Sequence, residues 1–419
     1  MRNTLLVVLL LLVAIAEALA TGKAIFHNLA WSLAGLLLVS YLWAWYNVNW
    51  IQLERETPSS RSQVGKVVEE RFLLHNRGPL PKLWVEVRDH SELPEHRASV
   101  AVSSLGPGRH RGWTVRTTCW RRGRYRLGPM TIISGDPFGL FVRRQRVTAT
   151  SSMVVYPLMV DLPRFGTLTG ELSGGGAVHR RTHYVTPNVC GVRDYYPGDS
   201  FNRIHWLSTA RTGRLIVKEF ELDPAADIWL FLDMEGAAHF ERRVESGPPT
   251  QGPRLTGRPQ MLEPSTEEYA VAVAASLSKH FIEHNRAVGL LAYGQHREMV
   301  QPERGQRQLT KILETLAVIR AQGHVGIGQL LSSEGSAFGR NAMAVVITPC
   351  IEVDWVAVLR GLRRRGVRGA GVIIDPASFG APVDATPVLL GLVEAGIPAY
   401  RVREGESLVA ALMNPAIPM

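Results

Sequence analysis

Two apolar runs near the N-terminus constrain this chain more than any other feature of its sequence. Residues 4–20 are almost wholly apolar, and residues 29–46 form a second apolar run. Each run is close to the roughly 20 residues that a helix needs to cross the hydrocarbon core of a bilayer. Interfacial aromatic residues crowd the end of the second run: Trp43, Trp45, Tyr46 and Trp50. Residues 1–50 are therefore predicted to form two transmembrane helices.

The first run also fits a cleavable signal peptide, because Arg2 precedes it and residues 18–20 read Ala-Leu-Ala. Both interpretations leave the rest of the chain on the same side of the membrane. Lys23 is the only Lys or Arg between the runs, whereas three basic residues follow the second one: Arg55, Arg61 and Lys66. The positive-inside rule then predicts an integral plasma-membrane protein whose soluble domains face the cytoplasm. Three widely spaced cysteines also favour a reducing compartment.

Residues 51–160 are predicted to form an antiparallel β-sandwich. Apolar and polar residues alternate along 83–88 and 113–120, with the period of two that a half-buried strand requires. Clusters of Gly, Pro and Asn at 76–79 and 106–109 have the composition of turns. Short strands at this spacing are typical of a small sandwich.

The predicted sandwich is strongly basic. Asp136 is the only acidic residue among about ten arginines in residues 101–150, and the whole chain has a net charge of +10. Arg121, Arg122, Arg124 and Arg126 stand especially close together. One interpretation is a solvated strand face, and the other is a patch held against an anionic lipid surface. We expect no nucleic-acid partner, because no recognised motif or aromatic stacking platform accompanies the charge.

The C-terminal part of the chain, residues 226–419, alternates buried strands with helices. Apolar strands are expected at 227–233, 287–293, 343–348, 370–374 and 399–402. Ser265 and Glu268 have capping-box spacing at the start of a helix, and a Pro/Gly-rich insertion at 247–264 is expected to be disordered. Alternation of this kind predicts a parallel sheet covered on both faces, in a Rossmann-like α/β domain. The predicted fold class is therefore α+β with several domains.

A dense run of charged, aromatic and turn-forming residues lies in the connecting region, residues 161–225. The candidate residues of this run are Arg193, Asp194, Tyr195, Asp199, Arg203, His205, Trp206, Lys218, Glu219 and Glu221. In one interpretation they form a polar junction between the β and α/β domains, because buried ions need partners. In the other, some are exposed and dock a protein, since Arg, Tyr and Trp often anchor interfaces.

Three segments of the chain resemble the family called domain of unknown function 58. They are residues 123–129 with 136–141, the central run at 193–221, and the α/β half that follows. The resemblance spans nearly the whole chain and implies a von Willebrand factor A-like domain for residues 226–419. It also implies association with a MoxR-type AAA+ ATPase, in a chaperone-like or maturation system. Proteins of this family are not established as enzymes.

The metal site of von Willebrand A domains gives a second hypothesis, a metal-dependent binding module. That site uses Asp-x-Ser-x-Ser and a later Thr, whose hard oxygens suit Mg²⁺. Here the run is Asp233-Met-Glu-Gly-Ala237, so both serines are missing, and Asp233, Glu235 and Thr348 remain as a degenerate set. We expect no cofactor, with Mg²⁺ as the less favoured alternative.

A third hypothesis is a hydrolase or transferase that uses residues 190–206. Cys190, His205 and Asp199 are residue types that form a nucleophile, a base and an orienting acid. A cysteine is more often a small buried residue, so no catalytic residue is assigned. The favoured prediction is a non-enzymatic, membrane-anchored interaction protein, whose partners are the bilayer and an AAA+ ATPase or its client.

Overall fold

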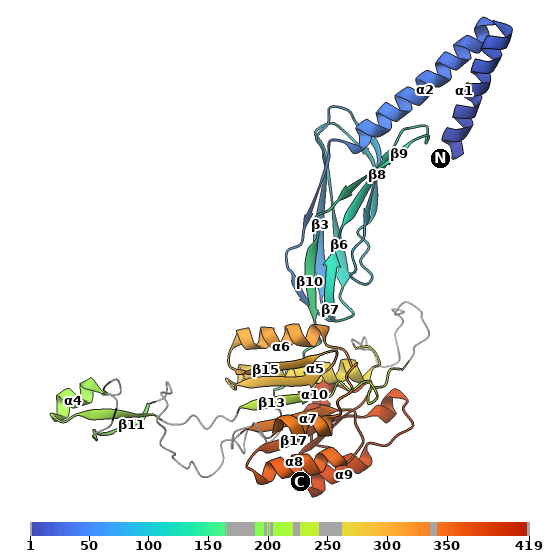
Figure 1. The fold of residues 1–419 in the computed structure, drawn as a ribbon. Coiled ribbons are helices and arrows are strands. Elements are labelled where there is room, and N and C mark those ends of the chain that lie inside the picture. Colours follow the sequence, from blue (N-terminus) through green and yellow to red (C-terminus); the bar gives the residue numbers. More distant parts are fainter. Residues whose placement is uncertain are drawn as a thin grey trace. The chain divides into compact units, whose positions relative to one another are not determined.

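The computed structural model of the 419-residue chain contains two compact units. The first comprises Met1–Leu158 with Leu316–Val318, and the second comprises Met159–Thr315 with Ile319–Met419. The residues that it describes are 2–163, 165, 189–196, 199, 201, 204–220, 227–242, 262–335 and 342–416. The chain is a mixed α and β protein, with two N-terminal apolar helices and several sheets (Figure 1). The predicted insertion at 247–264 lies outside the described residues as far as residue 261.

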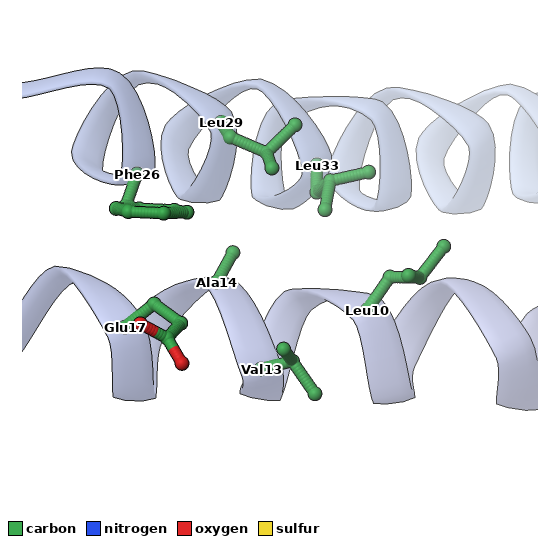
Figure 2. Close-up of a pocket in the computed structure, with 7 residues that line it drawn as sticks. All are labelled: Leu10, Val13, Ala14, Glu17, Phe26, Leu29 and Leu33. Atoms are coloured by element: carbon green, nitrogen blue, oxygen red, sulfur yellow. The ribbon is translucent and has the colours of Figure 1, made fainter.

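The two N-terminal helices are α1 (Arg2–Thr21) and α2 (Ala24–Val48). Both helices have the length and composition of a membrane span, and a signal sequence near the N-terminus would have the same properties. Small residues one turn apart, Ala14 and Ala18, are buried where α1 meets α2, as is usual for close helix packing in membranes. A pocket of about 180 Å³ lies between the helices, and Figure 2 shows its lining residues.

The rest of the first unit is made of β-sheets. One antiparallel sheet contains β1 (Ile51–Glu56), β3 (Val67–Asn76) and β6 (His110–Thr118). A second contains β4 (Lys82–Asp89), β5 (Val100–Leu105), β8 (Met130–Gly135) and β9 (Val142–Val147). A third contains β2 (Arg61–Gln63), β7 (Gly123–Leu127) and β10 (Ser151–Tyr156). The first two sheets share one core, in which Phe72 and Leu74 meet Val85 and Val87.

Hydrogen bonds fix the end of α2 to this β domain. The fully buried Lys82 ammonium donates to the main-chain carbonyls of Tyr46 (2.6 Å) and Asn49 (3.2 Å), which belong to the last turn and cap of the helix. Burial lowers the pKa of Lys82 to about 8. The Asn47 amide donates to the carbonyl of Gly135 at 2.8 Å. The β domain therefore begins where the apolar helix ends, without a free linker.

A buried ion network crosses the interior of the β domain. The Arg55 guanidinium donates to both carboxylate oxygens of Glu70, at 3.1 and 2.7 Å, and contacts Asp89 at 3.4 Å. The His96 ring lies 3.1 Å from Glu70 and 3.2 Å from Asp89. These four side chains are at most 8% exposed. The network joins β1, β3 and β4 through paired charges, as buried ions require.

The arginine cluster at 121–126 begins at the end of the β domain that lies away from α2. Strand β3 runs from Val67, which pairs with Thr118, to Asn76, which pairs with Ile51 directly after α2. Ten residues of strand span about 30 Å, and Figure 1 shows β7 at the end opposite α2. Arg122, moreover, is completely buried. The cluster therefore lies at the end of the β domain opposite α2.

The second unit contains a six-stranded sheet in the order β15-β14-β13-β16-β17-β18. Its strands are β13 (Ile228–Leu232), β14 (Val288–Tyr293), β15 (Arg297–Glu303), β16 (Met343–Thr348), β17 (Arg368–Ile374) and β18 (Ala399–Val402). All neighbouring strands are parallel except β15, which is antiparallel to β14. Every residue of β13 is buried, because both faces of the sheet are covered.

Helices cover both faces of this sheet. They are α5 (Thr266–Glu283), α6 (Gln306–Val318), α7 (Ile327–Glu334), α8 (Asp354–Arg364), α9 (Thr386–Glu394) and α10 (Leu408–Met413), with a 3₁₀ turn, η3 (Pro376–Phe379). Trp229 and Phe231 pack with α7, α8 and α9 on one face of the sheet. Helix α5 contacts four strands, β13, β14, β16 and β17. Ser265 caps α5 through the Glu267 amide, and Glu268 forms an ion pair with Arg320.

Candidate functional site

The central run forms a small, separate hairpin. Strand β11 (Val189–Asp194) pairs antiparallel with β12 (Ile216–Phe220), and α4 (Trp206–Thr212) lies between them in sequence. Ile204 and Val217 are the side chains of this hairpin that are buried among its described residues.

An ion pair organises the turn after β11. The Arg193 guanidinium donates to both carboxylate oxygens of Asp199, each at 2.7 Å. The same carboxylate accepts the main-chain amide of Tyr196 at 3.0 Å, and the Arg193 guanidinium lies 5.7 Å from the centre of the Tyr196 ring. A bidentate pair fixes orientation as well as distance, so it holds the Tyr196 main chain in place.

Large apolar and aromatic side chains of the hairpin point outward. The most exposed are Tyr196 (66%), Phe201 (68%), Trp206 (66%) and Leu207 (63%). Tyr195 is half-buried and stacks on Phe201 with 6.1 Å between ring centres. Exposed aromatic residues on an ordered segment are typical of a protein-binding surface.

The other predicted residues of the run have mixed positions. Asp194 is exposed, and its main-chain carbonyl accepts from Arg193 at 3.0 Å. Lys218 is half-buried on β12. Arg203, Glu221 and the side chain of Glu219 lie outside the described residues. The structure thus brings Arg193 and Asp199 together within the hairpin itself.

His205 and Asp199 take structural roles. The His205 ring caps α4, because its Nδ1 accepts the main-chain amide of Ser208 at 3.2 Å and lies 2.7 Å from the Ser208 hydroxyl. Asp199 is held by Arg193. The side chain of Cys190 lies outside the described residues. The contacts of His205 and Asp199 differ from those of a base and its orienting acid.

A second cluster lies at the carboxyl edge of the α/β sheet, directly after β13 and β16. Asp233 is 1% exposed, and one carboxylate oxygen accepts the Thr348 hydroxyl at 2.5 Å. Its other oxygen accepts the Glu235 amide at 3.1 Å. The Thr348 hydroxyl in turn accepts the amide of Cys350 at 2.9 Å. Asp233, Glu235 and Thr348, the three residues of the predicted degenerate set, therefore lie at the same edge of the sheet, where Asp233 accepts hydrogen bonds from the other two.

The pKa values of three ionisable groups at this edge are shifted upward. Burial is the main cause that raises the pKa of Asp233 above its ordinary value. Burial, and then the nearby charges of Asp233 and Glu352, raise the pKa of Glu235. Burial also raises the pKa of the Cys350 thiol to about 11. A shallow pocket of about 430 Å³ opens beside this edge, and its lining includes Glu235, Gln322 and His324.

The donor set does not fit the Mg²⁺ site of a von Willebrand A domain. Both Asp233 oxygens accept hydrogen bonds from within the protein, one from the Thr348 hydroxyl and one from the Glu235 amide. Glu235 and Ala237 stand where that site has serines. Within the residues that the structure describes, no three His, Cys, Asp or Glu side chains group closely enough to hold a metal ion.

Replacing Asp233 by Asn is expected to remove a pH dependence of stability without a large loss at neutral pH. Because the folded pKa of Asp233 is raised, the contribution of this group to stability is fully present below its unfolded pKa and is lost as pH rises through the folded pKa. The amide of Asn cannot ionise. The test is chemical unfolding of wild type and Asp233→Asn from pH 4 to pH 8. Asp233→Ala is the comparison, because it leaves the Thr348 hydroxyl without its buried acceptor, which costs about 1–3 kcal/mol of stability. Parallel pH profiles for wild type and Asp233→Asn would contradict the expectation.

Comparison with known proteins supports the family resemblance in part. The sequence model of the family described as "Protein of unknown function DUF58" matches residues 191–246 and 260–385. The chain is 23% identical over 366 residues to the uncharacterized protein YeaD of Bacillus subtilis, which is 83% of each protein. It is 26% identical over 216 residues to the uncharacterized protein Rv1480 of Mycobacterium tuberculosis, covering 49% of this chain and 60% of that protein.

Solved structures give weaker likenesses. The CARDB domain of the PF1109 protein from Pyrococcus furiosus, in complex with di-metal ions, is 21% identical with a TM-score of 0.20. The likeness covers 25% of this chain and 91% of that domain. A TM-score this low assigns neither a fold nor a function to the chain.

Proposed function

We propose that this chain is a membrane-anchored, non-enzymatic interaction protein whose soluble domains face the cytoplasm. The apolar helices α1 and α2 supply the anchor. Thr4 of α1 donates a hydrogen bond to the Leu140 carbonyl, and Lys82 binds the end of α2, so both helices meet the β domain at their ends away from the turn. This arrangement supports a helical hairpin whose two ends lie on the same side of the membrane. Its orientation rests on the Lys/Arg distribution around the two apolar runs.

The observation that carries the interaction role is the exposed aromatic surface of the β11–β12 hairpin. Tyr196, Phe201 and Trp206 are each about two-thirds exposed, although they belong to a segment ordered by the Arg193–Asp199 pair. Burying such side chains against a partner gains more free energy than burying polar surface of the same area. The proposed surface is therefore this hairpin rather than the carboxyl edge of the sheet.

The partner that we propose is a MoxR-type AAA+ ATPase, in a chaperone-like or maturation system. This identity rests on the family resemblance. We also propose that residues 226–419 form a von Willebrand A-like domain. The sheet order β15-β14-β13-β16-β17-β18, with a single antiparallel edge strand, supports that assignment.

Replacing Trp206 by Ala is expected to weaken binding to the ATPase at least tenfold. A well-packed interfacial Trp typically contributes about 2 kcal/mol or more, and about 1.4 kcal/mol corresponds to a factor of ten in affinity. The measurement is the affinity of a purified MoxR-type ATPase from the same organism for the full-length protein in lipid nanodiscs. Trp84→Ala is the matched control, because Trp84 is 39% exposed on β4. Equal loss in both variants would exclude the hairpin as the surface, and no binding to wild type would exclude the partner.

The proposed orientation has its own test. A reporter that is active only in the cytoplasm is expected to be active when it is fused after Met419, whereas a reporter that is active only in the periplasm is expected to be inactive there. Activity of a periplasmic reporter at this position would reverse the orientation, and a cytoplasmic ATPase would then be unable to reach the hairpin.

A further inference from the structure

The loop between β8 and β9, residues 136–141, is built to hold one aromatic side chain outward. Asp136 is 7% exposed, and its carboxylate accepts the main-chain amides of Phe138 (3.0 Å) and Phe141 (2.6 Å). Gly139 has a φ of +69°, where a Cβ atom would strain the backbone. These contacts give the loop one conformation. Phe138 nevertheless remains 59% exposed.

Contacts with both N-terminal helices fix where this loop lies. The Thr4 hydroxyl of α1 donates to the Leu140 carbonyl. The Phe141 ring meets the Tyr41 ring of α2 edge-on, with 5.7 Å between their centres. The Arg143 guanidinium lies 4.9 Å from the centre of the same Tyr41 ring. The loop and the first residues of β9 therefore lie against α1 and α2, rather than beyond their ends.

The two contact points on the helices are at the same height. Thr4 and Tyr41 are each 17 residues from the turn, counted from Thr21 and Ala24 respectively. At about 1.5 Å per residue, this places the loop about 26 Å from the turn. Lys23 in that turn requires water or headgroups, so the turn marks one boundary of the membrane. A hydrocarbon core of about 30 Å then puts the loop at the opposite boundary.

We propose that the β8–β9 loop is a second membrane contact, in which Phe138 and the neighbouring Val142 insert into the lipid interface beside α1 and α2. Val142, the first residue of β9, is 57% exposed. Arg143 and the exposed Arg144 follow it, and their charge suits anionic headgroups. The inference rests on the proposed membrane anchorage and deepens it, because it assigns the lipid contact to this loop and not to the 121–126 cluster. Such a contact restrains the β domain relative to the bilayer.

Photolabelling of the wild-type, full-length protein tests the proposal. The protein is reconstituted into vesicles of phosphatidylcholine and phosphatidylglycerol that contain a phospholipid with a diazirine just below its headgroup. After illumination and trypsin digestion, peptide 127–143 carries the loop, peptide 3–23 carries α1, and peptide 67–71 carries Val67. Val67 is the matched control, because it is 58% exposed at the end of β3 that lies away from α2. We expect labelling of the first two peptides, localised to residues 136–142 in the loop peptide, and several-fold less of the third.

Each other outcome has a defined meaning. Labelling of α1 without the loop would overturn this inference and leave the membrane anchorage intact. Absence of labelling in both would overturn the anchorage and, with it, this contact. Phe138→Ser is expected to reduce labelling of the loop several-fold without changing that of α1. Unchanged labelling of the loop in that variant would show that Phe138 is not the inserted residue.

Discussion

Replacing Glu70 by Gln is expected to destabilise the β domain by about 3–5 kcal/mol, the usual cost of removing one partner from a buried ion pair. Glu70 is 1% exposed and accepts hydrogen bonds from Arg55 and from the Thr57 hydroxyl (2.7 Å). Gln keeps the shape of Glu but removes the charge. The Arg55 guanidinium would then be left with Asp89 as its buried anionic neighbour, at 3.4 Å.

The thiol of Cys119 can report this loss of stability. Cys119 is 1% exposed in the β domain, and burial raises its pKa, so a thiol reagent reaches it only when the domain opens. We expect labelling of Cys119 in Glu70→Gln, followed by peptide mass spectrometry, to be about 100- to 4,000-fold faster than in wild type, since each 1.4 kcal/mol of about 3–5 kcal/mol is a factor of ten.

The neighbouring residue provides the control for this prediction. Glu69 lies on the opposite side of β3, where it is 39% exposed and pairs with Arg116 at 3.2 Å. Exposed ion pairs contribute about 0–1 kcal/mol, so Glu69→Gln should leave the labelling rate close to that of wild type. Equal rates for Glu69→Gln and Glu70→Gln would contradict a stabilising role for the buried network.

Replacing Gly323 by Ala is expected to disrupt the carboxyl edge of the α/β sheet. A Cβ atom at this position would lie 2.0 Å from the carbonyl oxygen of Tyr293 and 2.9 Å from that of Met234. Both neighbours are main-chain atoms, so relief requires the backbone to move. The Gly323 amide also donates to the Met234 carbonyl at 2.9 Å. Overpacking usually costs about 1–3 kcal/mol, and the rigid neighbours place this variant at the upper end of that range.

Hydrogen exchange of the full-length protein measures the effect. Amides of β13, which ends two residues before Met234, should exchange about a hundredfold faster in Gly323→Ala. Gly361→Ala is the matched control, because nothing lies within 4 Å of a Cβ at that position of α8. Ala in a helix is favoured over Gly by about 0.5–1 kcal/mol, so the control should slow exchange or leave it unchanged. Slower or unchanged exchange in Gly323→Ala would contradict the predicted clash.

The local pattern of apolar residues was sufficient to predict most strands of the α/β domain. The apolar stretch at 343–348 coincides with β16, and residues 399–402 coincide with β18. Continuous apolar runs predict such strands because both faces of a parallel sheet are covered. Strand β15 (Arg297–Glu303) escaped prediction. It is a half-exposed, antiparallel edge strand that contains Pro302, and edge strands lack the apolar run that marks a central one.

The candidate sites could be predicted only as residue types. The order of Asp233 and Thr348 along the chain fits the end of two strands, and the structure places them in hydrogen-bond contact. The raised pKa of Asp233 depends on burial, which no local pattern reveals. Arg193 and Asp199 belong to the run whose sequence predicts either a domain junction or a docking surface, and the structure pairs them with each other inside one hairpin. A short turn brings residues six positions apart together, but the sequence alone does not show which residues of the run pair.

The two apolar runs by themselves predicted two long N-terminal helices, because continuous apolar runs of about 20 residues are typical of helices whose backbone hydrogen bonds are all internal. Only the tertiary structure decided what those helices hold. It joins Lys82 to the end of α2, buries the Arg55–Glu70 pair inside the β domain, and places Leu140 against Thr4 and Phe141 against Tyr41. The physical reason is distance in sequence: periodicity reports which side of an element is buried, whereas partners far apart along the chain meet only after the sheets have packed.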